Sequence, residues 1–99
     1  MTRYIAAEAG PYGVRVNSVI PGFIIKDEHQ ERYQRDDNQE FRDRVNSIHP
    51  VRKAGCADDV ANAVAFLCSD AASFITGTEL VVDGGMTIQD QWKTVAPPR

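Results

Sequence analysis

The apolar positions of this 99-residue chain are densest in residues 14–25, which read VRVNSVIPGFII. β-Branched residues favour an extended chain and proline removes a donor from a sheet ladder, so the pattern predicts a strand over Val14–Ile20 that ends before Pro21. In an open α/β sheet, ligands bind beyond the carboxyl ends of the strands, where a glycine lets the backbone approach closely. Pro21 and Gly22 are therefore the first candidate site, with an ordinary turn after a buried strand as the alternative.

Residues 1–9 predict the last turns of a helix that stops at Gly10-Pro11, with Thr2 as the candidate N-cap. A dense polar block follows the strand, over residues 26–48. Apolar residues at positions 41, 45 and 48 recur at helical spacing, which predicts an amphipathic helix with Arg42 and Arg44 on its solvent side. The first half of the block shows no such period and is expected to be mobile, and the whole block is typical of a solvated surface insertion.

A further helix is expected from Asp58 to Cys68, because acidic residues occupy its first turn and apolar residues recur along one face. That face makes Cys68 a predicted core residue. Residues 79–83 predict a short strand before Gly84-Gly85, a pair that permits the positive φ of a turn. Two strands joined by helical segments indicate a βαβ crossover with parallel strands.

The composition of the chain argues against nucleic-acid-binding, metal-binding and membrane-spanning proteins. Eleven basic and fourteen acidic side chains give a formal net charge of −3, and the basic residues are interspersed with acids, unlike the basic patch of a nucleic-acid-binding protein. Cys56 and Cys68 are too few for a zinc site or a disulfide framework, so no metal ligand is assigned. No stretch matches a membrane span or a signal peptide. We expect one small core, no nucleic-acid or membrane partner, and a cytoplasmic location.

Three segments carry a resemblance to a known family. Residues 13–22 read GVRVNSVIPG, residues 52–61 read RKAGCADDVA, and residues 66–77 read FLCSDAASFITG and lead to VDGG at residues 82–85. In this order and spacing they resemble the C-terminal part of the short-chain dehydrogenases/reductases. The resemblance implies an α/β fold, the C-terminal part of a Rossmann-like doubly wound parallel sheet: its last two strands, a lid helix and the last helix, incomplete as a fold.

The resemblance also implies an organisation along the chain. Residues 1–85 form the family segment, residues 26–48 within it form the lid over the substrate, and residues 86–99 form a C-terminal tail. Family members commonly assemble as homo-oligomers through the last helix and strand. Trp92 in the tail either covers its own subunit or anchors such an interface, because aromatic residues are enriched at interface cores.

The catalytic groups of the family are missing from this sequence. Dehydrogenation needs a glycine-rich turn for the cofactor pyrophosphate and a Tyr with a Lys four residues on, yet no tyrosine here is followed by lysine at that spacing. By resemblance, the catalytic pair would lie upstream of Met1. His29 and His49 lie in polar or turn contexts with no paired nucleophile and are expected at the surface. We therefore assign no catalytic residue and expect the chain alone to be inactive.

The resemblance assigns the nicotinamide end of an NAD or NADP site to the loop after the first strand. Pro21, Gly22 and Ile24 would contact the nicotinamide through the backbone. Lys26 stands where a Thr is common, and lysine donates hydrogen bonds but cannot accept them. It would reach a phosphate, or it would mark a variant that does not bind.

The expected function is a fragment of an NAD(P)-dependent oxidoreductase that acts on the CH–OH group of a small-molecule alcohol or on the matching carbonyl. This chain would supply the nicotinamide-side loop, the substrate lid and the oligomer interface. The alternative is a non-catalytic interaction or assembly module, or a relic gene product. The choice between NAD and NADP is made near the second strand of such folds, which this chain lacks, and the lid sequence names no substrate.

Overall fold

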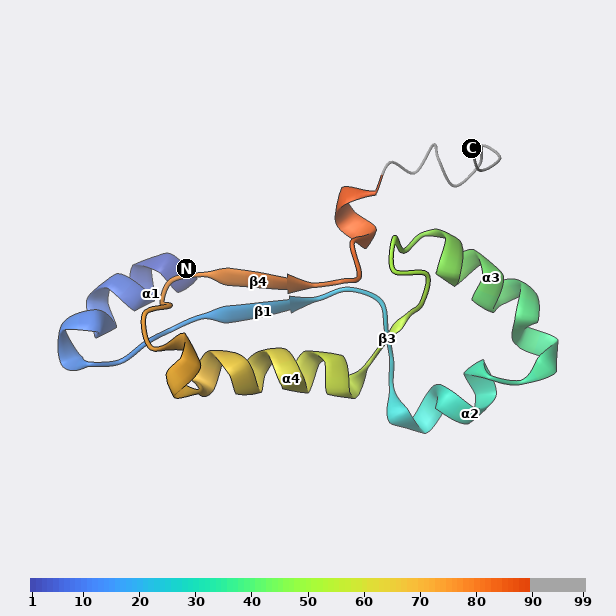
Figure 1. Ribbon diagram of the computed structural model, residues 1–99, viewed down its shortest axis with the longest axis horizontal. Helices are drawn as coiled ribbons and strands as arrows, with labels where there is room; N and C mark the ends of the chain where they lie inside the picture. Colours follow the sequence, from blue (N-terminus) through green and yellow to red (C-terminus); the bar gives the residue numbers. More distant parts are fainter. Residues whose placement is uncertain (90–99) are drawn as a thin grey trace. The chain divides into compact units, whose positions relative to one another are not determined.

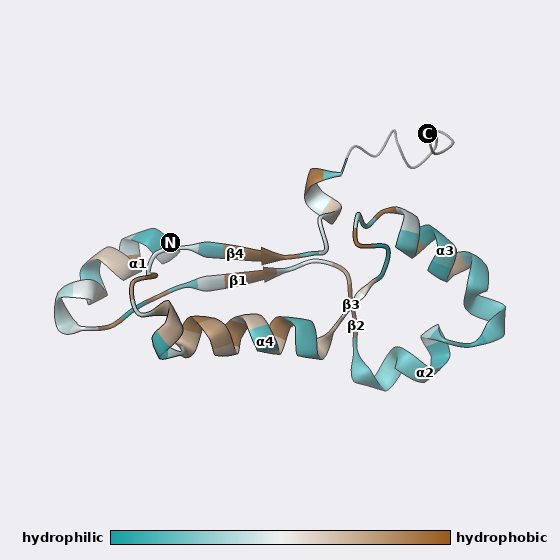
Figure 2. Cartoon of the chain, in the orientation of Figure 1, coloured by the Kyte–Doolittle hydropathy of each residue, from teal (hydrophilic) through white to brown (hydrophobic). Residues whose placement is uncertain are grey.

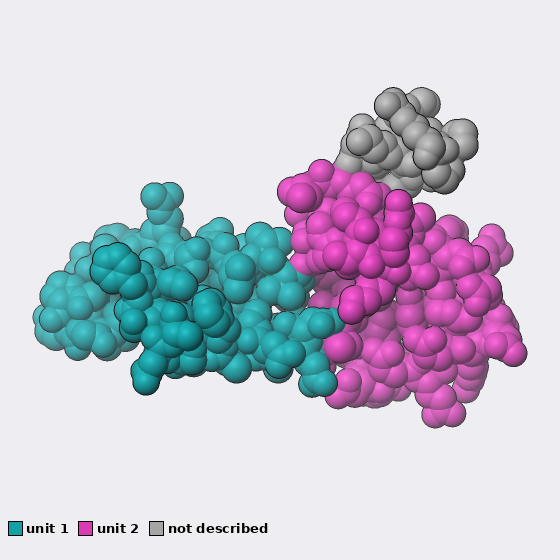
Figure 3. Space-filling view, in the orientation of Figure 1, with its two compact units in different colours: residues 1–21, 58–82 teal, residues 22–57, 83–99 magenta. Residues whose placement is uncertain are grey.

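The computed structural model describes residues 1–89, which divide into two compact units (Figure 3). Unit 1 contains residues 1–21 and 58–82, and unit 2 contains residues 22–57 and the chain from residue 83 onward. The expectations for Trp92 and for the tail beyond residue 89 lie outside the described residues. None of the helices within residues 1–89 has the length and the apolar run that crossing a bilayer requires.

Unit 1 is built on a parallel pair of strands, β1 (Ser18–Pro21) and β4 (Glu79–Val82), with Ser18 opposite Glu79 and Pro21 opposite Val82. Helix α4 (Ala57–Cys68) lies along β1 in Figure 1 and connects the strands by a crossover. The predicted parallel arrangement is confirmed. The strand boundaries were wrong, because β1 begins at Ser18 rather than Val14 and includes Pro21.

The late start of β1 has a local cause. The side chain of Asn17 makes the hydrogen bonds that backbone groups would make in a regular strand pair. Its Nδ2 donates to the Ile75 carbonyl at 3.0 Å, and its Oδ1 accepts from the Thr78 amide at 3.0 Å. The Val16 amide likewise donates to the Thr76 hydroxyl, at 3.0 Å. Side chains therefore fix the chain before β1, and regular pairing begins one residue later.

Helix α1 (Thr2–Ala9) confirms the first predicted helix, but Thr2 is not its N-cap. Met1 holds that position without a side-chain hydrogen bond, and the Thr2 hydroxyl hydrogen-bonds with the hydroxyl of Ser18 instead. Ala6 is buried and packs near Gly77, where an added Cβ would lie 3.5 Å from the Ala6 Cβ. Thr2 therefore ties α1 to β1 instead of capping the helix.

The C-terminal end of α4 is held by Arg15. Its guanidinium donates to the carbonyls of Leu67, Ile75 and Ser69 at 2.8, 3.2 and 3.3 Å. Leu67 is buried, but Cys68, which was predicted in the core, is exposed. It lies at the rim of a cavity of about 550 Å³ between α4 and the segment around Val16, so the described residues do not cover it.

Unit 2 contains a small parallel pair that the sequence reading missed, β2 (Ile24–Ile25) with β3 (Gly55–Cys56). Between these strands lie η2 (Asp27–His29), α2 (Gln30–Tyr33), η3 (Asp36–Asn38) and α3 (Gln39–Ser47), and η5 (Met86–Ile88) follows β4. The predicted amphipathic helix is confirmed as α3, with Val45 buried. The first half of the block, in which the sequence shows no helical period, forms short helices that are largely hydrophilic (Figure 2).

Arg42 explains how this polar block keeps its shape. Its Nη1 donates to the carbonyls of Tyr33 and Arg35 at 2.5 and 2.6 Å, and its Nη2 donates to Gln39 Oε1 at 2.7 Å. Arg42, predicted on the solvent side, is half-buried, and its side chain satisfies the turn between α2 and α3. Arg44 is exposed, as predicted.

His49 was expected at the surface, and this was also wrong: its exposed fraction is 1%. Its Nδ1 lies 2.7 Å from the Val45 carbonyl and donates to it. The turn at Gly84 and Gly85, with φ of 62° and 88°, packs against residues 49–51, because a Cβ on Gly84 would lie 2.6 Å from Val51 Cγ2. The two predicted turn glycines thus bring distant backbone over the histidine.

Candidate functional site

The candidate site begins where the parallel strands of unit 1 end. Pro21 and Val82 are opposite one another as the last residues of β1 and β4, so both strands reach the same carboxyl edge. Pro21 is exposed there. This edge is where ligands bind in open parallel sheets, and the role of Pro21 at a ligand stays a prediction.

Gly22, the first residue of unit 2, has a packing reason to be glycine. A Cβ on Gly22 would lie 2.5 Å from the Cβ and 2.9 Å from the Cα of Asp83. Real Cβ atoms essentially never come that close, so only glycine lets the two backbones meet here. The absent side chain is thus explained by contact with Asp83, which the sequence reading did not identify.

Ile24 and Lys26 follow on the same loop. Ile24 is half-buried and lies opposite Gly55 in the β2–β3 pair, while the next residue, Ile25, is buried. Lys26 is exposed and extended, and its carbonyl accepts from the His29 amide at 2.8 Å. Within residues 1–89 its ammonium group has no ion pair or hydrogen bond. Lys26 is therefore a free cation two residues after Ile24.

The carboxylate of Asp83 accepts hydrogen bonds at both of its oxygens. Its Oδ1 accepts from the Gly85 amide at 2.8 Å, and its Oδ2 accepts from the amide and hydroxyl of Thr87 at 3.0 and 2.5 Å. The hydrogen bonds from Thr87, and then the one from Gly85, lower the pKa of Asp83 below its ordinary value. Asp83 stays ionised at neutral pH and fixes the turn that faces Gly22.

An aromatic row crosses unit 2 behind this loop. Phe23 lies 6.4 Å from Phe41 and 6.3 Å from His49, and Phe41 lies 6.2 Å from Tyr33, between ring centroids. Edge-on and tilted pairs at these separations are favourable. Burial raises the pKa of the Tyr33 phenol, against a smaller lowering by Arg42. The row joins the loop after Gly22 to the helices of the polar block.

His49 forms one end of that row and offers no catalytic pair. With Nδ1 donating to Val45, its Nε2 is an acceptor, and it has no hydrogen-bond partner among the described residues. No group of three or more His, Cys, Asp or Glu side chains within residues 1–89 is placed to hold a metal ion.

The model of the family described as enoyl-(acyl carrier protein) reductase matches residues 1–87. This chain belongs to the short-chain dehydrogenase/reductase family. L-Rhamnose 1-dehydrogenase (NAD(P)(+)) of Azotobacter vinelandii is 41% identical over 86 residues, which are 87% of this chain and 32% of that protein. The chain thus spans about a third of the length of the curated relatives it matches.

Solved structures of this short-chain dehydrogenase/reductase family agree. A 4-hydroxyisoleucine dehydrogenase mutant complexed with NADH and succinate has a TM-score of 0.73 at 35% identity, with 90% of this chain and 35% of that chain covered. ElxO with NADP bound has a TM-score of 0.73 at 38% identity, with 89% and 35% covered. The family resemblance read from the sequence is confirmed, and these relatives are Rossmann-fold proteins with NAD(P) cofactors.

Proposed function

We propose that this chain is the C-terminal part of an NAD(P)-dependent short-chain oxidoreductase that interconverts small-molecule alcohols and carbonyls. Residues 1–85 supply the last two strands and the last helix, residues 26–48 cover the substrate, and residues 86–99 form a tail. The observation that carries the proposal is the shared carboxyl edge of β1 and β4, with Pro21 at its end. In parallel sheets this edge is the ligand-binding edge.

The residues of the loop fit the nicotinamide end of a cofactor rather than the whole cofactor. Pro21 and Lys26 are exposed and Ile24 is half-buried, so the loop offers backbone, an aliphatic side chain and one cation. Gly22 faces Asp83, so its role is to let the loop pack closely. When bound, NAD or NADP accepts or donates the hydride, and in this proposal Pro21, Gly22, Ile24 and Lys26 hold and orient its nicotinamide end.

Lys26 provides the test, in a chimera in which this chain replaces the matching 86-residue stretch of L-rhamnose 1-dehydrogenase. A hydrogen bond to a charged group contributes about 1.5–3 kcal/mol, so Lys26→Thr should change the Kd for NADH or NADPH by about tenfold or more. Lys53→Thr, at another exposed lysine of unit 2, is the matched control. Kd values that stay equal in both variants would place the loop away from the cofactor.

A second candidate function is a non-catalytic assembly module, favoured by exposed apolar side chains in unit 1. Val64, Ile20 and Val81 have exposed fractions of 44%, 41% and 48%, and Phe74 is fully exposed. Large apolar surfaces are typical of interaction sites. In both candidates we propose that the last helix and strand, α4 and β4, form the interface of a homo-oligomer.

Val64→Asp tests the assembly proposal, because a carboxylate on the α4 surface disfavours an apolar interface without entering the core of the isolated chain. The expected result is an unchanged far-UV circular dichroism spectrum with a smaller sedimentation coefficient. Ala65→Asp, on the same exposed helix, is the control. Wild-type oligomer size in the Val64 variant would contradict an interface at this position.

A further inference from the structure

A cavity of about 310 Å³ lies in unit 2, between Ile25 and the short helices of the polar block. Its lining residues combine apolar and polar side chains: Ile25, His29, Arg32, Tyr33, Asn38 and Phe41. Volumes of this size are typical of small-molecule sites, which have mostly apolar walls and a few polar groups that set orientation. A ligand in this cavity would bind to those polar groups that have no hydrogen-bond partner in the protein.

Two of the polar groups are already engaged. Asn38 Nδ2 donates to the Arg32 carbonyl, at 2.5 Å, and so fixes the turn after α2. His29 Nε2 lies 3.6 Å from the carboxylate of Glu28. Tyr33 differs, because its hydroxyl has no hydrogen bond within residues 1–89, and burial raises the pKa of this neutral donor further. Its ring also packs on Phe41, which holds it in place.

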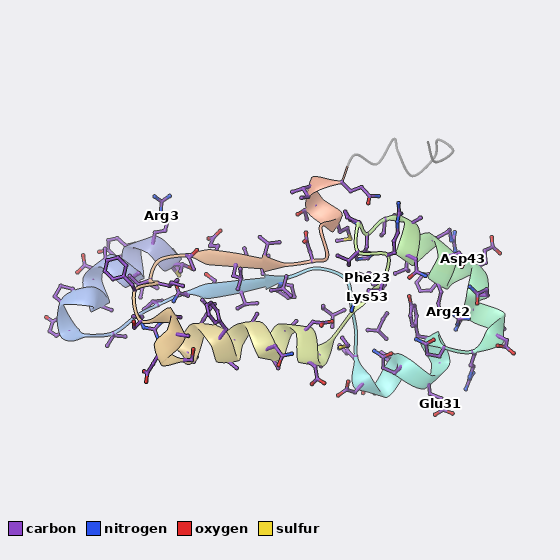
Figure 4. The ribbon with its side chains drawn as sticks, viewed as in Figure 1. Arg3, Phe23, Glu31, Arg42, Asp43 and Lys53 are labelled. Atoms are coloured by element: carbon purple, nitrogen blue, oxygen red, sulfur yellow. The ribbon has the colours of Figure 1, made fainter. Side chains whose placement is uncertain are left out.

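Arg32 is the available cation of this cavity. Its carbonyl accepts hydrogen bonds, but across the described part of the chain its guanidinium has no ion pair and no hydrogen bond. Arg42 differs, since its guanidinium is occupied by three acceptors. The neighbouring carboxylates of Glu31 and Asp43 point outward from α2 and α3 (Figure 4). Arg32 is exposed, and within residues 1–89 no carboxylate pairs with its guanidinium, so the charge is open to an anion.

We propose that this cavity binds a small carboxylate with an apolar body, an aryl or branched alkyl oxo acid or hydroxy acid. The carboxylate pairs with the planar guanidinium of Arg32, which matches its two oxygens, and the apolar body lies between Ile25 and Phe41. The Tyr33 hydroxyl donates to the same anion. Van der Waals contact with an aromatic wall favours a planar or branched body over an extended polar one.

This inference rests on the proposed function, in which residues 26–48 cover the substrate. The hydroxy acid is then the reduced substrate: NAD(P)⁺ takes the hydride from its carbinol carbon, its hydroxyl proton is released, and the products are the oxo acid, NAD(P)H and one proton. The cavity recognises the carboxylate and the apolar body of the substrate, and the hydride leaves from the carbon that joins these two groups.

Phenylglyoxylate is the probe, and methyl phenylglyoxylate is its uncharged counterpart. Each is titrated into the isotopically labelled 99-residue chain, and the Kd is measured from amide shifts of residues 25–41 in two-dimensional NMR spectra. The expected result is binding of the acid, and a Kd that rises about ten- to hundredfold in Arg32→Gln, because a charge-assisted pair is lost. The ester should bind weakly, and equally to both proteins.

Arg35→Gln is the matched control, because Arg35 is exposed, lies three residues away and does not line the cavity. Tyr33→Phe should raise the Kd by a smaller factor than Arg32→Gln. Equal Kd values for the wild type and Arg32→Gln, an equal effect of Arg35→Gln, or equal binding of acid and ester would each overturn the proposal. Undispersed amide signals from residues 25–41 would also overturn it, since the cavity would not exist in solution.

The proposed function fails separately. Lys26→Thr could leave the Kd for NADH unchanged in the chimera with L-rhamnose 1-dehydrogenase, while Arg32→Gln still weakens phenylglyoxylate binding. That result would support the anion site and contradict the cofactor role of the loop. If Lys26→Thr changes the Kd for NADH but acid and ester bind equally, the cofactor role is supported and the anion site is contradicted.

Discussion

Gly22→Ala tests whether close packing, rather than a cofactor, requires glycine at the start of the candidate loop. The added Cβ would lie 2.5 Å from the Cβ and 2.9 Å from the Cα of Asp83. Carbon atoms in good contact are separated by about 3.5–4.0 Å, so the two backbones would have to move apart by about 1 Å. Gly22 is not among the glycines with positive φ, so the strain comes from this contact and not from its dihedral angles.

The magnitude follows from two opposing effects. Overpacking of a filled site typically costs about 1–3 kcal/mol, and here the atoms in the way include backbone, which yields less readily than the end of a side chain. Replacing glycine with alanine also restricts the unfolded chain, which stabilises the protein by about 0.4–1 kcal/mol. The steric effect is the larger, so the free energy of unfolding should fall by about 1–2 kcal/mol. Each kcal/mol lost should lower the Tm by about 4–8 °C.

Urea unfolding and thermal unfolding of the 99-residue chain, followed by circular dichroism, measure this change. Gly10→Ala is the control, because a Cβ there has no atom within 4 Å and Gly10 has an ordinary φ of −51°. The free energy of unfolding of the Gly10→Ala protein should rise by about 0.4–1 kcal/mol, because only the restriction of the unfolded chain remains. A Gly22→Ala protein as stable as the wild type would show that Gly22 and Asp83 are not in contact, and the loop glycine would need another explanation.

Three further predictions concern the charged groups and activity. Because the pKa of Asp83 is lowered in the folded state, its carboxylate stabilises the fold above pH 3.8, and this stabilisation disappears as the pH falls through the folded pKa. Asp83→Asn should therefore reduce the acid-induced fall in the free energy of unfolding, measured by urea titration at a series of pH values. Asp37→Asn is the control and should not reduce it. Arg15→Gln should lower the free energy of unfolding by about 1–3 kcal/mol through lost bonds to the end of α4, with exposed Arg3→Gln unchanged in the same assay. The 99-residue chain alone should neither bind NADH by fluorescence titration nor transfer hydride, and micromolar binding would contradict this.

The sequence predicted much of the local structure because its signals were local. The apolar face and acidic first turn of α4, the amphipathic period of α3, and the glycines after β4 each specify an element without reference to distant residues. The order of two strands joined by helical segments predicted the parallel arrangement of β1 and β4. The assignment of Pro21, Gly22, Ile24 and Lys26 to a cofactor stays a proposal, since it depends on groups that this chain does not contain.

Burial and partner choice depended on the tertiary structure, because they join residues far apart in the chain. The turn at Gly84 covers the histidine at position 49, about 35 residues earlier, and Asp83 meets Gly22 across about sixty residues. No local pattern spans either distance. The guanidinium of the half-buried Arg42 donates to three acceptors, a choice that the helical period of α3 does not specify. A periodic pattern specifies which face of an element is apolar, and only the packed chain decides what covers that face and which polar groups remain free.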